Sequence, residues 1–166
     1  MNKIKNNFKK FWNFLKQDTW KSWVVSLILA LVFIKFIFFP ALSFVTGARL
    51  PLVVVESCSM YHNDDFEGWW ESNKAWYERR GIEKEDFENF RFKNGLNKGD
   101  IILVSGRGER DIGQVVIFNS EFKFPLIHRV VYTTPSIGTK GDNNFDQLPQ
   151  EGKINEDAIL GRAVFR

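Results

Sequence analysis

The sequence has little of the chemistry that marks a metalloprotein, a disulfide-stabilised protein or a nucleotide-binding protein. It contains one cysteine, Cys58, which excludes an intrachain disulfide, and only two histidines, His62 and His128. It has no internal repeat, no glycine-rich phosphate loop and no Cys/His cluster with the spacing of metal ligands. We therefore expect no metal and no other cofactor.

Acidic residues are scarce near the N-terminus, and this scarcity explains the net charge of +3. Residues 1–21 carry six lysines and a single acidic residue, Asp18, whereas the rest of the chain is net negative. The positive charge is a local cluster, so it does not indicate a nucleic-acid partner, and we expect none.

One long apolar run lies between Trp23 and Thr46, with Lys35 as its only charged residue. About 20 apolar residues suffice to cross a bilayer, so residues 23–46 predict a transmembrane helix that Pro40 kinks or ends. Lys35 would snorkel or face a partner helix. A cleavable signal peptide is disfavoured, because the lysine-rich segment before the run is long and the run exceeds a signal peptide's apolar core.

The charge asymmetry around this run predicts its orientation. Lysines precede the run and Arg49 follows it, which places the N-terminus in the cytoplasm and residues 47–166 outside a single-pass cell-membrane anchor. Residues 1–22 predict a basic amphipathic segment that lies on the lipid bilayer, or alternatively a solvated positive flank. Apolar residues recur in it at helical spacing, namely Phe8, Phe11, Trp12 and Leu15.

The remaining residues, about 115–120 of them, suffice for one domain with a sizeable core. Residues 61–93 are rich in aromatic and acidic residues, and their spacing predicts one or two short helices broken at Gly81. Elsewhere the pattern is one of strands and turns, so we expect a mainly β domain. The predicted strands are Leu50–Glu56, Ile101–Val104, Val115–Phe118, Ile127–Thr133, Ile137–Lys140 and Ala158–Phe165.

Candidate site residues are few. Ser59 lies in Ser57-Cys58-Ser59-Met60, shortly after the apolar run, and His128 lies on a predicted strand where a structural role is also common. Asp142 and Asp146 lie in a polar turn, where such residues first of all make turns. Activating a hydroxyl requires a base and a group that orients the base, and Ser59, His128 and either aspartate could supply all three.

Several blocks resemble, in order, the type I signal peptidases of the archaeal and endoplasmic-reticulum branch, which use a Ser-His-Asp site. The resemblance covers the span and most of the domain but not residues 61–93. The blocks are Ser57-Cys58-Ser59-Met60, Lys98-Gly99-Asp100-Ile101-Ile102, Ile127-His128-Arg129-Val130, Lys140-Gly141-Asp142-Asn143-Asn144 and Ile159-Leu160-Gly161-Arg162-Ala163.

The resemblance implies a fold, an activity and a set of roles. It implies a signal-peptidase-type β domain and a serine endopeptidase that removes signal peptides from secreted preproteins, with small residues before the cut. Ser59 would be the nucleophile and His128 the base, with Asp142 or Asp146 orienting it. Ser57 and the Ser59 amide would stabilise the oxyanion. Val53, Val54, Val55 and Met60 would contact the substrate, in part by strand addition.

Two departures from the family pattern leave alternatives open. The family usually has proline where this chain has His62, and residues 61–93 form an insertion between blocks that usually lie close together. The insertion could pack on the domain, sit at the lipid interface or cover the substrate groove. His62 is an alternative base and Cys58 an alternative nucleophile.

The expected partners are preproteins, the bilayer and, as a further candidate, the protein-translocation channel. The competing function is a membrane-tethered binding or scaffolding module of the same fold. A LexA-like self-cleaving protease is a third alternative, but it requires a lysine at the position of His128.

Overall fold

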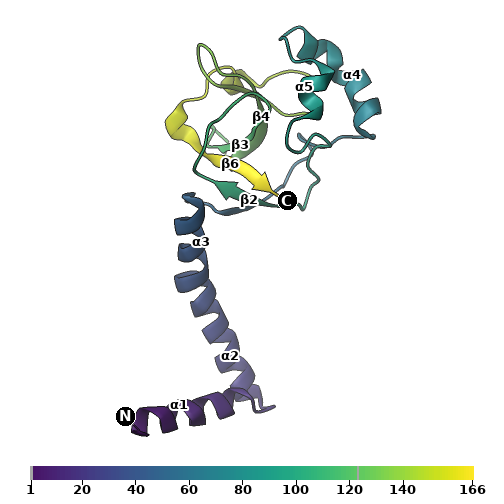
Figure 1. The fold of residues 1–166 in the computed structure, drawn as a ribbon. Coiled ribbons are helices and arrows are strands. Elements are labelled where there is room, and N and C mark those ends of the chain that lie inside the picture. Colours follow the sequence, from purple (N-terminus) through teal and green to yellow (C-terminus); the bar gives the residue numbers. More distant parts are fainter. Residues whose placement is uncertain (1, 123) are drawn as a thin grey trace. The chain divides into compact units, whose positions relative to one another are not determined.

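The computed structural model describes residues 2–122 and 124–166. The chain divides into two compact units, Met1–Phe44 and Val45–Arg166 (Figure 1). The two units are described separately below.

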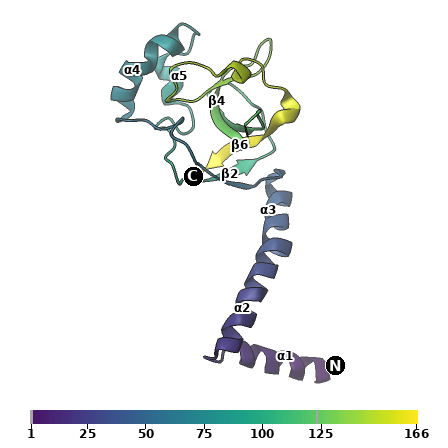
Figure 2. The ribbon, with the colours of Figure 1, turned by 180° about the vertical axis from the view of Figure 1, so that it is seen from behind.

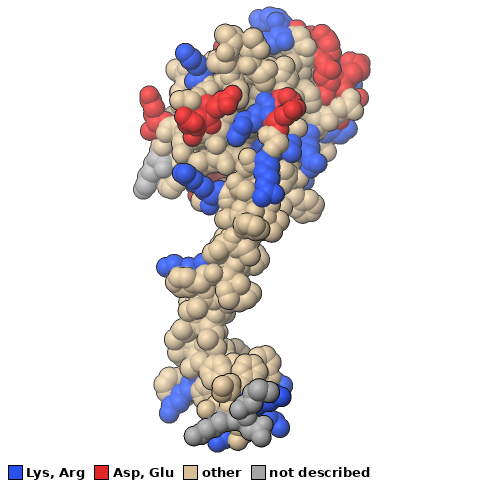
Figure 3. Space-filling view, turned by 60° about the vertical axis from the view of Figure 1, so that its left-hand side comes forward, with Lys and Arg blue, Asp and Glu red and all other residues tan. Residues whose placement is uncertain are grey.

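The first unit consists of helices. A basic helix, α1 (Asn2–Leu15), precedes a continuous helical segment, Trp20–Thr46, that is 27 residues long and apolar enough to cross a membrane. Thr19 begins this segment, because its hydroxyl accepts a hydrogen bond from the Ser22 amide at 3.3 Å. Figure 3 shows the long helix almost free of charged side chains. Its parts are α2 (Trp20–Phe33), the π-helix η1 (Ile34–Phe38) and α3 (Phe39–Thr46).

Pro40 does not end the helix. The π-helix η1 ends two residues before Pro40, and the Phe39 amide donates to the carbonyl of Ile34, five residues back instead of four. This wider turn shifts the hydrogen-bond ladder next to the proline, which has no amide hydrogen of its own and would crowd a regular α-turn. The helix therefore continues through Pro40 to Thr46, and the prediction that the proline could terminate it is wrong.

The second unit is built on one six-stranded sheet in the order β1-β2-β6-β3-β4-β5, with every neighbouring pair antiparallel. All six predicted strands are confirmed to within two residues at each end. Short 3₁₀ turns, η2 (Pro149–Glu151) and η3 (Glu156–Ala158), lie between the last two strands. The strands are β1 (Leu52–Val54), β2 (Ile101–Ser105), β3 (Val115–Phe118), β4 (Leu126–Tyr132), β5 (Gly138–Lys140) and β6 (Ile159–Phe165).

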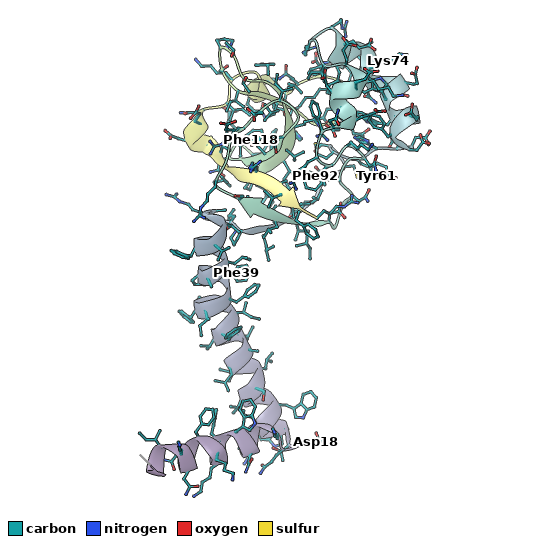
Figure 4. The ribbon with its side chains drawn as sticks, viewed as in Figure 1. Asp18, Phe39, Tyr61, Lys74, Phe92 and Phe118 are labelled. Atoms are coloured by element: carbon teal, nitrogen blue, oxygen red, sulfur yellow. The ribbon has the colours of Figure 1, made fainter. Side chains whose placement is uncertain are left out.

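Both faces of the central strand β3 are buried, which explains why it has no polar alternation. Val115 and Ile117 pack into a cluster with Met60 on one face. Val116 and Phe118 pack into a second cluster on the other face (Phe118 is labelled in Figure 4). The sheet is therefore covered on both faces. The neighbouring strand β4 carries His128, whose side chain is buried inside the domain.

Residues 61–93 form helices α4 (Phe66–Glu78) and α5 (Lys84–Glu88), which lie side by side at one side of the domain (Figures 1 and 2). The prediction of helices broken at Gly81, which adopts a positive φ of 73°, is confirmed. With these helices added to the N-terminal ones, the chain is a mixed α and β protein. The expectation of a mainly β fold is thus corrected.

The tryptophans of the insertion are buried in a third cluster against Val131 of β4. Of the three roles considered for residues 61–93, packing on the sheet is the one that the structure displays. The insertion also closes on itself, because the Leu96 amide donates to the Met60 carbonyl at 2.7 Å. The chain thus leaves and re-enters the domain at nearly one point. The buried aromatic residues are Trp69, Trp70, Trp76, Tyr77 and Phe87.

Candidate active site around Ser59

Ser59, His128 and Glu151 form a continuous chain of hydrogen bonds. The Ser59 hydroxyl lies 2.9 Å from Nε2 of His128, and Nδ1 of the same ring lies 2.5 Å from Oε1 of Glu151. A carboxylate can only accept hydrogen bonds, so Nδ1 carries the proton and Nε2 presents its lone pair to the serine. This is the arrangement that general-base activation of a hydroxyl requires.

Three different elements bring these side chains together. Ser59 lies in the loop after the edge strand β1, His128 lies within β4, and Glu151 ends the 3₁₀ turn η2. His128 and Glu151 are both buried, whereas Ser59 is partly accessible. The base and its partner are therefore shielded, while the hydroxyl can be reached from outside.

Glu151 replaces both aspartates that the sequence suggested as the orienting acid. Its Oε1 also accepts from the Thr139 hydroxyl at 2.9 Å, and its Oε2 accepts from the Leu148 amide at 2.7 Å. The one local signal in the sequence is an acid three residues after Leu148 in a turn that begins with Pro149. That pattern predicts a cap for the turn's own backbone and gives no hint of a distant histidine.

Asp142 is buried on a different set of partners. Its carboxylate forms a two-pronged ion pair with Arg129, at 2.9 and 2.6 Å, and accepts from His62 at 3.0 Å. Tyr77 donates to it at 3.4 Å. The carboxylate is thus fully occupied away from His128.

Asp146 is mostly exposed and accepts from the Trp76 indole at 2.8 Å, with Arg80 at 3.9 Å. The expectation that Asp142 or Asp146 orients His128 is corrected by these contacts. Both aspartates instead connect the polar turn to the helical insertion.

The turn after β5 holds the backbone of the loop that carries Ser59. The Asn143 amide donates to the Ser59 carbonyl at 2.7 Å, and the Asn143 side chain donates to the Cys58 carbonyl at 3.1 Å. Gly141 lies so close that a Cβ there would stand 2.8 Å from the Ser59 carbonyl and 2.9 Å from Nε2 of His128. The Lys-Gly-Asp-Asn-Asn block therefore positions the serine and leaves its hydroxyl to His128.

The other residues of the nucleophile motif have distinct places. The Ser57 hydroxyl lies 3.1 Å from that of Ser59, on the same side of the loop, whereas Cys58 is exposed. The Met60 side chain is buried in the core, with its sulfur accepting from the Asp142 amide at 3.4 Å. Ser57 thus places a second hydroxyl beside that of Ser59.

An apolar groove of about 540 Å³ opens beside Ser59. All four predicted substrate-contacting residues lie on its wall, and β1 is an edge strand with one side unpaired in the described sheet. An extended peptide laid in this groove would run past the serine with a strand edge beside it. The wall includes Val53, Val54, Val55, Met60, Ile127 and Leu126.

Burial and charge shift the pKa of several groups behind the serine. Burial alone would raise the pKa of Asp142, but the Arg129 charge and the hydrogen bonds from His62 and Arg129 hold that pKa well below its usual range. Burial lowers the pKa of Lys140 to about 8. Asp142 is therefore held in its anionic form by its partners, whereas Lys140 loses its proton at a lower pH than an exposed lysine does.

The described residues contain no group of three or more His, Cys, Asp or Glu side chains placed to hold a metal ion. No model of a known protein family and no curated protein matches the chain.

Proposed function

We propose that the protein is a membrane-anchored serine endopeptidase of the signal-peptidase type, which removes N-terminal signal peptides from secreted preproteins. The observation that carries this proposal is the set of hydrogen bonds that connects Ser59, His128 and Glu151. Ser59 lies on the wall of an apolar groove beside an edge strand. The ordered sequence blocks and the single apolar helix support the same conclusion.

In the first half of the reaction the Ser59 oxygen attacks the scissile carbonyl while its proton moves to Nε2 of His128. Glu151 holds the ring in the required tautomer and stabilises the imidazolium that forms. The tetrahedral intermediate then collapses, the C–N bond breaks, and the imidazolium gives its proton to the leaving amine. The mature protein leaves and the signal peptide remains as an ester on Ser59.

In the second half water attacks this ester and gives its proton to His128. The second tetrahedral intermediate then collapses, the bond between the acyl carbon and the Ser59 oxygen breaks, His128 returns the proton to that oxygen, and the signal peptide leaves with a free carboxylate. In both halves the negative charge on the carbonyl oxygen would be stabilised by the Ser57 hydroxyl and the Ser59 amide. Loss of one such donor costs about 10²- to 10³-fold in rate.

The groove and the apolar helix account for the substrate class. An extended segment with small residues before the cut would pair with β1 and place its side chains against Val53 and Val55. The helix Trp20–Thr46 would hold enzyme and substrate at one membrane and so raise their effective concentration. With the N-terminus in the cytoplasm, residues 47–166 would act on the outer side of the membrane. The translocation channel would deliver preproteins to that side.

The test is cleavage of a purified preprotein by the full chain in detergent. Ser59→Ala and His128→Ala should each lower kcat by about 10⁴-fold or more, since members of such a site act as a unit. Cys58→Ala is the matched control and should cleave at the wild-type rate, because its side chain is exposed away from the hydrogen-bonded chain. Full activity in either site variant would exclude the mechanism.

The competing function, a tethered scaffold without turnover, predicts a different outcome. Such a protein would leave the preprotein uncut, and a fluorophosphonate probe would not label Ser59. Labelling that disappears in Ser59→Ala would exclude the scaffold.

A further inference from the structure

His62 connects the nucleophile loop to the helical insertion. It stands three residues after Ser59, and its Nε2 donates to Asp142 at 3.0 Å. Its ring lies flat against the indole of Trp69 in α4, with centroids 3.8 Å apart and an interplanar angle of 3°. His62, Trp69 and Asp142 are all buried, and we call this set the His62 clamp.

The clamp closes a loop of contacts around the serine. From Ser59 the chain runs to His62, which is bonded to Asp142, and the next residue, Asn143, donates back to the Ser59 carbonyl. The segment that carries the nucleophile is thus tied to the Asp142 turn at two points. Gly141 belongs to the same turn, and a Cβ added there would stand 2.9 Å from Nε2 of His128, so the turn that holds the serine loop also passes close to the base.

The hydrogen bonds define the state of the ring. Asp142 only accepts, so Nε2 of His62 carries the proton, while Nδ1 is buried and bonds no group among the described residues. Protonating Nδ1 would bury an N–H without an acceptor, and the charge of Asp142 is already balanced by Arg129. Nε2 of His62 is therefore engaged by Asp142, and the alternative in which His62 serves as the base for Ser59 has no support in the geometry.

The stacking of His62 on Trp69 and its hydrogen bond to Asp142 hold the backbone that follows Ser59 in place. Stacking of this kind adds to the area buried and holds both rings in a single orientation. The position of Ser59 consequently depends on whether α4 is packed on the domain.

We infer that His62 is a positioning residue, through which the packing of α4 sets the placement of Ser59 relative to His128. This inference rests on the proposed peptidase function. Removing the clamp leaves Arg129 on Asp142 and leaves the groove wall intact. The change should therefore lower kcat by about 10- to 100-fold, as a misplacement of about 1 Å does, while KM stays within about twofold.

Two substitutions separate the parts of the clamp. His62→Phe keeps a flat ring for Trp69 but cannot donate to Asp142, whereas Trp69→Leu removes the stacking and keeps the hydrogen bond. If the clamp acts as one unit, the double variant should lose little more kcat than the worse single variant. Fully additive losses would overturn the inference.

Trp70→Leu is the matched control for Trp69→Leu. Trp70 is the next residue of α4, equally buried in the same cluster, and it has no ring contact with His62 among the described residues. Both variants should lose similar stability, but only Trp69→Leu should lower kcat. An equal loss of kcat in both variants would show a merely structural role and overturn the inference.

The measurements are preprotein cleavage by the full chain in detergent and the rate of Ser59 labelling by a fluorophosphonate, at a temperature where circular dichroism shows each variant folded. If His62→Phe does not fold, His62→Gln takes its place. Glutamine can still donate to Asp142 but cannot stack on Trp69, so adding Trp69→Leu to it should lower kcat little further. A wild-type chain that neither cleaves nor labels would defeat the proposed function itself. Normal wild-type activity with unaltered kcat in the clamp variants would defeat only the inference.

Discussion

The two oxygens of Glu151 have different partners, and this division explains how a short turn can orient His128, the base of the proposed mechanism. Oε2 is fixed by the Leu148 amide, so the carboxylate is anchored to its own backbone, while Oε1 is directed to His128 and Thr139. A carboxylate held by such bonds needs no movement when the imidazole becomes charged.

Glu151→Gln should therefore lower kcat by about 10⁴-fold, the size of effect seen when a triad aspartate becomes asparagine, because the neutral amide cannot stabilise the imidazolium. Asp146→Asn is the control and should stay within about twofold of wild type, since its contacts are exposed. Preprotein cleavage at saturating substrate concentration measures kcat for both variants. Equal losses in the two variants would remove Glu151 from its assigned role.

Gly141→Ala should abolish most cleavage, because the added methyl would press on the Ser59 carbonyl and on Nε2 of His128. We expect a fall in kcat of at least about 10²-fold, given the sensitivity of such reactions to misplacement. The matched change Gly152→Ala has its nearest neighbours at 3.6 and 4.0 Å and should be silent. Single-turnover cleavage compares the two; an active Gly141→Ala enzyme would contradict the close approach.

Lys140 should make stability depend on pH. Its folded pKa of about 8 lies below the unfolded value of 10.5, so between these pH values the unfolded chain binds more protons and stability rises with pH. The gain from pH 7 to 9.5 should be about 2 kcal/mol, and Lys140→Met should remove it. Urea denaturation of both proteins at several pH values tests this. Identical pH dependence would refute it.

Ser59 and His128 could be predicted from sequence because each stands in a short block whose order resembles a known family. Glu151 could not, because its task depends on a contact across 23 positions that nothing in its neighbourhood encodes. Asp142 and Asp146 lie near the site in a polar turn, but Asp142 pairs with Arg129 of β4 and with His62, and Asp146 accepts from Trp76 of α4. Their side-chain partners, like that of Glu151, are set by long-range packing.

Among the elements, the six strands could be predicted because β-branched and apolar runs are bounded by Gly, Asn and Pro. The course of the helix at Pro40 could not. Whether a proline ends a helix depends on whether the preceding turn can widen, as η1 does, and local propensity does not specify this.

The aromatic cluster of the insertion should contribute strongly to stability. Phe87 is fully buried against several aromatic rings and the Arg129 guanidinium, so Phe87→Ala should cost about 3–5 kcal/mol of unfolding free energy. Phe145→Ala removes a side chain that is 98% exposed and should change stability by less than about 0.5 kcal/mol. Chemical denaturation followed by circular dichroism compares them. A small loss for Phe87→Ala would mean that the cluster is loosely packed.

At the scale of the whole molecule, the chain separates into a helical unit and a unit that holds every residue of the candidate site. The sequence indicated the division through its abrupt change from apolar to mixed composition at Thr46. It did not indicate the strand order, because each strand's neighbour is set by long-range packing of its two faces.

A chain that lacks residues 1–44 should therefore fold and react with a fluorophosphonate at Ser59 as fast as the full chain. It should no longer float with lipid vesicles, since the apolar helix and the basic α1 are gone. Flotation and labelling measured on one preparation test both parts. Failure of the shortened chain to label, while it stays folded, would show that the helical unit contributes to the site.

The bond between Leu96 and Met60 has a consequence for shortening this molecule. A segment whose two ends meet can be replaced by a short link without pulling the flanking strands apart, so the six strands would keep their order. The loop that carries Ser59 would then lose the stacking of His62 on Trp69. Such a shortened domain would keep its sheet and hold that loop less firmly.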